Sequence, residues 1–199
     1  MVMKIGDVSW GYRVDDWATW NVGKDVESEA DDLAVRYADG PDAQAVVRRS
    51  VIAVNADALP KKGILRQAIW IPDRSTGEGM AMLDAFLWGF PKGADPSAEA
   101  FVVRRNLKKD MGRGSKIFDY DVGFTDVPAG PSVTEAYTIR MRHETVIQGY
   151  LLFSIFPETA TAAFCLQFST VHLDLMKKMS EEARIIAESV EISLWDDPA

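Results

Sequence analysis

Residues 118–124 read Phe-Asp-Tyr-Asp-Val-Gly-Phe, and this stretch decides the fold because its apolar and polar side chains alternate with a period of two. Such alternation is typical of a β-strand, in which successive side chains point to opposite faces. Three further strand-like segments follow over residues 133–141, 146–156 and 162–170. Their short connections favour antiparallel neighbours. The sequence therefore predicts four antiparallel strands in succession.

The residues before this run predict two helices, with short strands before and after them. Helical spacing of Val47, Val51 and Val54 indicates a helix, with a strand at 51–54 as the alternative. The preceding helix, over 27–38, has an acidic first turn, which suits the positive end of the helix dipole. The predicted elements are two short extended pieces within residues 8–22 around an Asp15-Asp16 turn, helices over 27–38 and 42–58, and strands over 64–71 and 80–90.

Two more helices flank the four strands. For the first, Asp95 is predicted to cap the helix with Pro96 at its first position, and the predicted buried stripe is Ala100, Val103 and Leu107. The second has apolar residues at three- and four-residue steps over 176–190 and passes into a short strand. The whole pattern predicts a single α+β domain over residues 1–199, with an antiparallel β-sheet flanked by helices.

Charge and cysteine content bound the environment and the partners. The net charge is −8, and residues 1–42, with ten acidic and four basic side chains, hold −6 of it. This acidity disfavours nucleic acid as a partner. One cysteine and no apolar run long enough for a membrane span predict a soluble cytoplasmic protein without membrane insertion. The basic residues clustered within 104–116 predict a solvated helix end, with a docking patch for an acidic partner as the alternative.

No residue pattern predicts a catalytic or metal site, and no cofactor is expected. His143 and His172 lack the spacing of metal ligands. Asp119 and Asp121 share one strand face, as a two-acid site requires, but that face is the polar one and predicts solubility. Cys165 lies mid-strand in an apolar neighbourhood, where a thiol is usually inert. The sequence therefore favours a non-catalytic protein, and an enzyme with scattered site residues stays open.

Aromatic residues gather near the N-terminus, and they are the candidate ligand- or partner-binding residues. Two interpretations compete: they anchor the N-terminus in the core, or they form a partly exposed binding surface, since Trp and Tyr dominate interfaces. The residues are Trp10, Tyr12, Trp17 and Trp20.

Part of the chain resembles the Mog1/PsbP-like group. The residues that carry the resemblance are Gly11-Tyr-Arg-Val-Asp-Asp-Trp17, Val127-Pro-Ala-Gly-Pro131 and Ile186-Ala-Glu-Ser-Val-Glu-Ile192. The resemblance implies an antiparallel sheet between helices, an α/β/α sandwich, and no shared catalytic residues.

Taken together, these observations predict a protein-interaction or accessory module whose protein partner and oligomeric state are unknown. The alternative is a domain that binds a small hydrophobic ligand, with methionines such as Met176 and Met179 lining an adaptable cavity.

Overall fold

The computed structural model describes residues 3–10, 15–23, 25–61, 63–91, 93–105, 114–142 and 144–196. Its contacts divide the chain into two compact units, a small unit of Val14–Phe86 and a large unit of Met1–Arg13 with Leu87–Ala199. Both units combine helices with antiparallel strands, so the predicted α+β class is confirmed. Whether the 199 residues form a single domain stays a prediction.

The small unit pairs three antiparallel strands with two helices. β3 pairs with both of the other strands, so it lies between them. The elements are β2 (Trp17–Asn21), α1 (Val26–Tyr37), α2 (Pro41–Ala58), β3 (Ile64–Trp70) and β4 (Ala81–Gly89), of which residues 81–86 belong to this unit.

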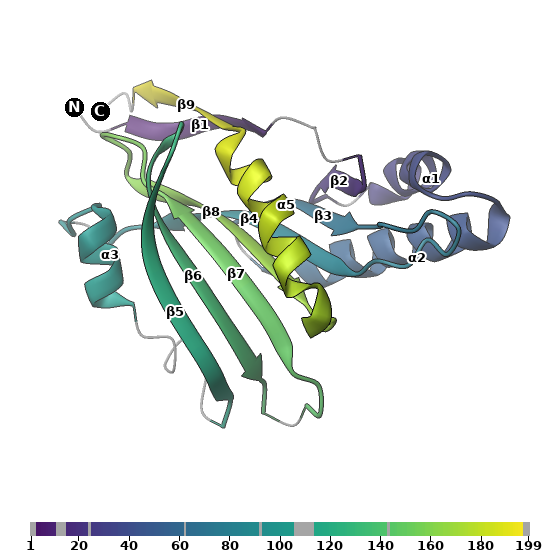
Figure 1. The fold of residues 1–199 in the computed structure, drawn as a ribbon. Coiled ribbons are helices and arrows are strands. Elements are labelled where there is room, and N and C mark those ends of the chain that lie inside the picture. The colour runs from purple at the N-terminus through teal and green to yellow at the C-terminus, as the bar shows by residue number, and fades with distance from the viewer. Residues whose placement is uncertain are drawn as a thin grey trace. The chain divides into compact units, whose positions relative to one another are not determined.

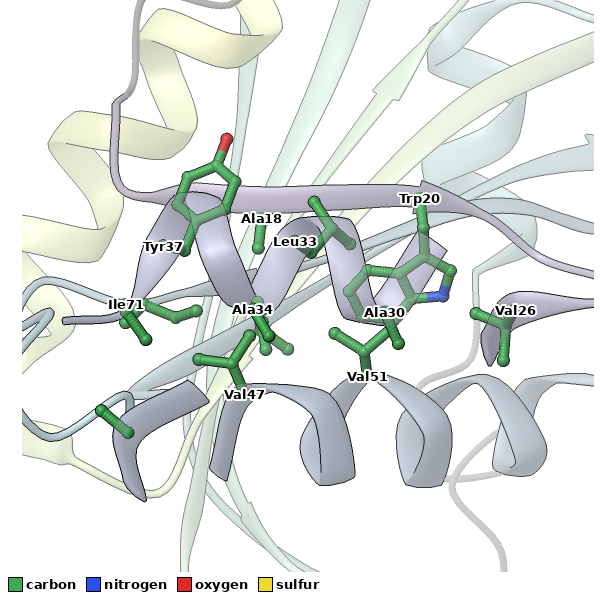
Figure 2. Packing of buried hydrophobic residues seen from close by; sticks show 13 residues of the cluster. Ala18, Trp20, Val26, Ala30, Leu33, Ala34, Tyr37, Val47, Val51 and Ile71 are labelled. Atoms are coloured by element: carbon green, nitrogen blue, oxygen red, sulfur yellow. The ribbon is translucent and has the colours of Figure 1, made fainter. Parts of the chain in front are cut away.

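The helices of the small unit form one core with its strands. Figure 2 shows Val47 and Val51 of α2 pointing toward the side chains of α1 and toward Trp20 of β2. All three of these side chains are fully buried. Because Val51 faces the core as part of a continuous helix, the strand alternative at 51–54 is wrong and the helix predicted over 42–58 is confirmed. Asn55, one turn further on, binds the backbone of Gly23 through both its amide nitrogen and its oxygen.

The large unit contains the four successive strands that the sequence predicts. They are antiparallel in the order β8-β7-β6-β5, and a separate two-stranded ladder joins the first and last strands that the structure describes. The elements are β1 (Met3–Trp10), α3 (Ala98–Arg104), β5 (Lys116–Val127), β6 (Gly130–Arg140), β7 (Gln148–Ile155), β8 (Ala162–Thr170), a 3-10 turn (Leu173–Leu175), α5 (Met176–Glu188) and β9 (Val190–Asp196).

The C-terminal helix covers β7 and β8 of this sheet. α5 contacts both strands, and Figure 1 shows it lying across them. Met179, Ala183 and Ile186 are buried, as the predicted apolar stripe requires. The chain then enters β9 at Val190, so the predicted passage from this helix into a short strand is also confirmed.

The structure corrects the predicted start and buried face of α3. Its N-cap is Ser97, whose hydroxyl accepts from the Ala100 N–H, whereas the Asp95 carboxylate accepts from the Ser97 N–H. The buried face also differs, since Ala98 and Phe101 are the buried residues of the helix. Phe101 is buried, while Val103 is 85% exposed and the prediction for it is wrong. The predicted stripe residue Leu107 lies outside the described residues.

Candidate functional site: an exposed strand at a sheet edge

Strand β5 is exposed along almost its whole length. Every residue from Phe118 to Asp126 is exposed to solvent. Four of them have large apolar side chains, with exposed fractions of 41% for Phe118, 45% for Tyr120, 37% for Val122 and 60% for Phe124. Contiguous apolar surface of this kind marks interaction sites more often than isolated exposed residues do.

The position of β5 in the sheet leaves one side of its backbone open. β5 pairs with β6 from Lys116 to Val127, and among the residues that the structure describes it has no second partner strand. Figure 1 shows β5 as the outermost of the four large-unit strands. An edge strand presents unpaired N–H and C=O groups that can pair with another chain. β5 therefore combines free backbone groups with exposed apolar side chains.

The two faces of β5 differ in chemistry. Tyr120, Val122 and Phe124 share one face, and Asp119 and Asp121 share the other. On the acidic face, the Thr138 hydroxyl donates to the Asp119 carboxylate at 3.0 Å. The solvent exposure predicted for the two aspartates is thus confirmed.

A buried ion pair holds the aromatic face of β5. The Arg105 Nε donates to both carboxylate oxygens of Glu135 at 3.1 Å, and the two side chains are only 6% and 0% exposed. The Tyr120 hydroxyl donates to the same carboxylate at 2.8 Å. The Arg105 guanidinium also lies 5.2 Å from the centre of the Trp88 ring. Glu135 thus links β5, β6 and the end of α3.

Three tyrosines lie side by side next to this ion pair. The Tyr137 ring stacks on Tyr150 with centroids 5.1 Å apart, and it lies 6.4 Å from the Tyr120 ring. The Tyr137 hydroxyl is buried and has no hydrogen-bond partner among the described residues. Burial raises the pKa of Tyr120 to about 12, with the hydrogen bond to Glu135 acting in the same direction. Burial likewise raises the pKa of Tyr137.

The buried thiol next to this cluster is also held in its neutral form. Cys165 is fully buried, and its Sγ lies 3.6 Å from the Ser154 hydroxyl. Burial raises the pKa of Cys165 to about 12. At neutral pH the thiol and the Tyr120 and Tyr137 phenols are therefore protonated, so they are hydrogen-bonding and packing groups rather than nucleophiles or bases.

The aromatic residues singled out near the N-terminus lie in the cores of the two units. Trp10 in the large unit is 6% exposed and lies 6.3 Å from Phe164. In the small unit, Trp17 and Trp20 are 2% and 1% exposed. Tyr12 lies outside the described residues. The three described tryptophans pack as core anchors, and the role in binding suggested for all four residues stays a prediction.

The basic cluster at residues 104–116 does not form one surface in the described residues. Arg105 is buried with Glu135, whereas the Lys116 ammonium lies 4.8 Å from the centre of the Phe118 ring. Arg104 donates to the Asp95 carbonyl at 2.7 Å. The remaining basic residues of the cluster lie outside the described part of the chain.

The described residues contain no group of three or more His, Cys, Asp or Glu side chains that could hold a metal ion. His172 is exposed, its side chain makes no helix-cap hydrogen bond, and His143 is not described. No helix in the described part of the chain is both long and apolar enough to cross a membrane.

Sequence reasoning missed β5 as a site, although it identified the alternation of residues 118–124. The alternation shows that the strand has two chemically distinct faces. It does not show whether a helix covers the apolar face or whether the strand lies at the edge of the sheet. Likewise, Arg105 and Glu135 are 30 residues apart in the sequence, and no local pattern predicts that they pair.

No protein-family model and no curated protein sequence matches the chain. Among solved structures, the chain is similar to LpqN, which is described as involved in cell envelope biogenesis of Mycobacterium tuberculosis. The two are 14% identical with a TM-score of 0.45, and the match covers 64% of this chain and 71% of LpqN. A likeness at this level supports no conclusion about activity, partner or compartment. The resemblance to the Mog1/PsbP-like group and the cytoplasmic location therefore stay predictions.

Proposed function

We propose that this chain is a protein-interaction module that binds its partner along β5, without catalysing a reaction. The observation that carries the proposal is a row of exposed apolar side chains, Tyr120, Val122 and Phe124, on a strand with one open backbone edge. In strand addition, the open edge supplies main-chain hydrogen bonds and the alternating side chains supply specificity. β5 offers both.

The anchoring of β5 supports this function. A strand that binds a partner needs a defined conformation before binding, because ordering it during binding would weaken affinity. The Tyr120–Glu135 and Asp119–Thr138 hydrogen bonds fix β5 on both faces against β6. The protonated state of the two phenols and of the buried thiol agrees with a scaffold role.

Site-specific photo-crosslinking in cells of the source organism tests the proposal. A photo-reactive phenylalanine analogue replaces Phe124 in one protein, and in the control it replaces Val103, which is 85% exposed on α3. We expect a defined protein to be crosslinked from position 124 and not from position 103. Adding the Val122→Lys substitution should abolish this crosslink. Equal recovery from both positions, or indifference to Val122→Lys, would contradict binding at β5.

The second candidate function is binding of a small, largely hydrophobic ligand next to the tyrosines. The buried Tyr137 hydroxyl without a partner favours it, because such a donor gains a hydrogen bond when a ligand supplies an acceptor. Thermal-shift screening with lipids and hydrophobic metabolites tests this function. A ligand that stabilises the native protein but not a Tyr137→Phe variant would support it, and the absence of any stabilising ligand would count against it.

A further inference from the structure

Resting on the proposed function, we propose that the partner segment is an extended strand in which apolar residues alternate with lysine or arginine. The two chemically different faces of β5 require this alternation. Side chains directly opposite each other in antiparallel strands have Cβ atoms about 5 Å apart and interact as pairs. Residues opposite Tyr120, Val122 and Phe124 would therefore be apolar.

The acidic face of β5 favours basic residues at the partner positions that alternate with the apolar ones. Asp121 is exposed and has no hydrogen bond or ion pair with a described residue. Within the described part of the chain, Asp119 is bound only by the neutral Thr138 hydroxyl. The only cation on the strand, Lys116, lies over the Phe118 ring instead. A basic partner would neutralise charges that the described residues leave uncompensated, and the net charge of −8 would speed its approach.

Space for a long basic side chain exists at the centre of the acidic face. A Cβ placed on Gly123 would meet no atom within 4 Å. A lysine or arginine opposite Gly123 would be diagonal to Asp121, and long side chains bridge such diagonal pairs. Gly123 therefore leaves room for a basic side chain to lie across β5 toward the Asp121 carboxylate.

The same charges oppose a second copy of this chain as the occupant. Antiparallel pairing of two β5 strands about Val122 would match Tyr120 with Phe124, which suits the apolar face. It would also bring the aspartates of both strands into one ribbon, with the two copies of Asp121 diagonal to each other across the symmetry axis. Like charges on an edge strand are a common means of preventing self-association. The structure thus favours a basic partner strand over a dimer.

The test uses nine-residue fluorescent peptides and fluorescence anisotropy. The first peptide alternates valine and lysine, with N-methyl groups along one edge so that it cannot pair with itself. The second replaces lysine with glutamate. The third has the composition of the first but groups its residues in pairs, which destroys the alternation. We expect the alternating lysine peptide to bind at least tenfold more tightly than the other two, and to weaken as the salt concentration rises.

Variants of the protein distinguish binding at β5 from the preference for a basic partner. Asp119→Asn combined with Asp121→Asn should weaken the lysine peptide about three- to tenfold, because each cross-strand charge pair contributes a fraction of a kcal/mol. The matched control is Asp57→Asn, a charge loss at an exposed position of α2. Val122→Lys should abolish binding altogether. Circular dichroism of each variant checks that the fold is retained.

The outcomes test the basic partner and binding at β5 separately. Equal binding of the lysine and glutamate peptides, or no loss in the double aspartate variant, would overturn the basic-partner inference but leave binding at β5 intact. Unchanged binding by the Val122→Lys variant would overturn binding at β5 itself. If no peptide binds at millimolar concentration, the inference is also wrong. A dimer in light scattering that Val122→Lys abolishes would identify a second copy as the occupant and overturn the basic partner.

Discussion

The buried ion pair between Arg105 and Glu135 provides the sharpest stability prediction. Glu135→Gln preserves the shape of the side chain but removes its charge. The Arg105 guanidinium then stays in a site where its side chain is only 6% exposed, without the carboxylate that it binds at 3.1 Å. Removing one charge of a buried ion pair deprives the remaining charge of that partner and costs about 3–5 kcal/mol.

The structure places the expected cost at the lower end of this range. The glutamine oxygen can still accept one of the hydrogen bonds that Glu135 accepts, from either Arg105 or Tyr120. We therefore expect a loss of about 3 kcal/mol in the free energy of unfolding. For a chain of this size, that loss corresponds to a fall of about 6–12 °C in the melting temperature.

Urea unfolding followed by circular dichroism, together with calorimetry, measures the loss. Glu158→Gln, at an exposed position, is the matched control and should change stability by less than about 0.5 kcal/mol. The double variant Arg105→Met with Glu135→Leu removes both charges and should recover most of the stability. If the double variant is as unstable as Glu135→Gln, or if Glu135→Gln behaves like the control, loss of the charge pairing between Glu135 and Arg105 is not the cause.

Two further predictions concern a glycine and the response to alkaline pH. Gly77 has a φ of +68°, and a Cβ there would overlap the Ala43 carbonyl oxygen, whereas Gly40, with a φ of +83°, has open space around it. In urea unfolding, Gly77→Ala should cost more than Gly40→Ala, because Gly40→Ala carries only backbone strain, about 1–3 kcal/mol for a φ of +83° with a ψ of 163°. Equal costs would mean that the Ala43 backbone shifts freely. The pKa values of Cys165 and Tyr120 are raised to about 12 from ordinary values of 9.0 and 10.0, so the folded state retains protons that the unfolded state has lost. These groups should therefore leave stability unchanged below pH 9 and lower it from pH 9 toward pH 12. Melting temperatures measured across this range should fall, and Cys165→Ala should make the fall less steep. A flat profile would mean that the thiol and the phenol are solvated.

The sequence determined most of the local structure of this protein. Periods of two and of three to four residues located the strands from β3 onward and the helices α1, α2 and α5. These patterns succeed because they record which side chains of one segment share a face. Even here the tertiary structure corrected the buried face of α3, where Phe101 is buried and Val103 is exposed, because the face that packs depends on neighbouring segments.

The candidate site was decided only by the tertiary structure. The alternation in residues 118–124 shows that β5 has an apolar and an acidic face. It contains nothing about the order of strands in the sheet, which places β5 at the edge and leaves Val122 and Phe124 in solvent. The same holds for the partner of Glu135. Alternation places Glu135 on the apolar face of β6 with Val133 and Tyr137, but it does not show the pairing with Arg105. Burial and strand order depend on contacts between segments far apart in the chain, and a pattern within one segment cannot record them.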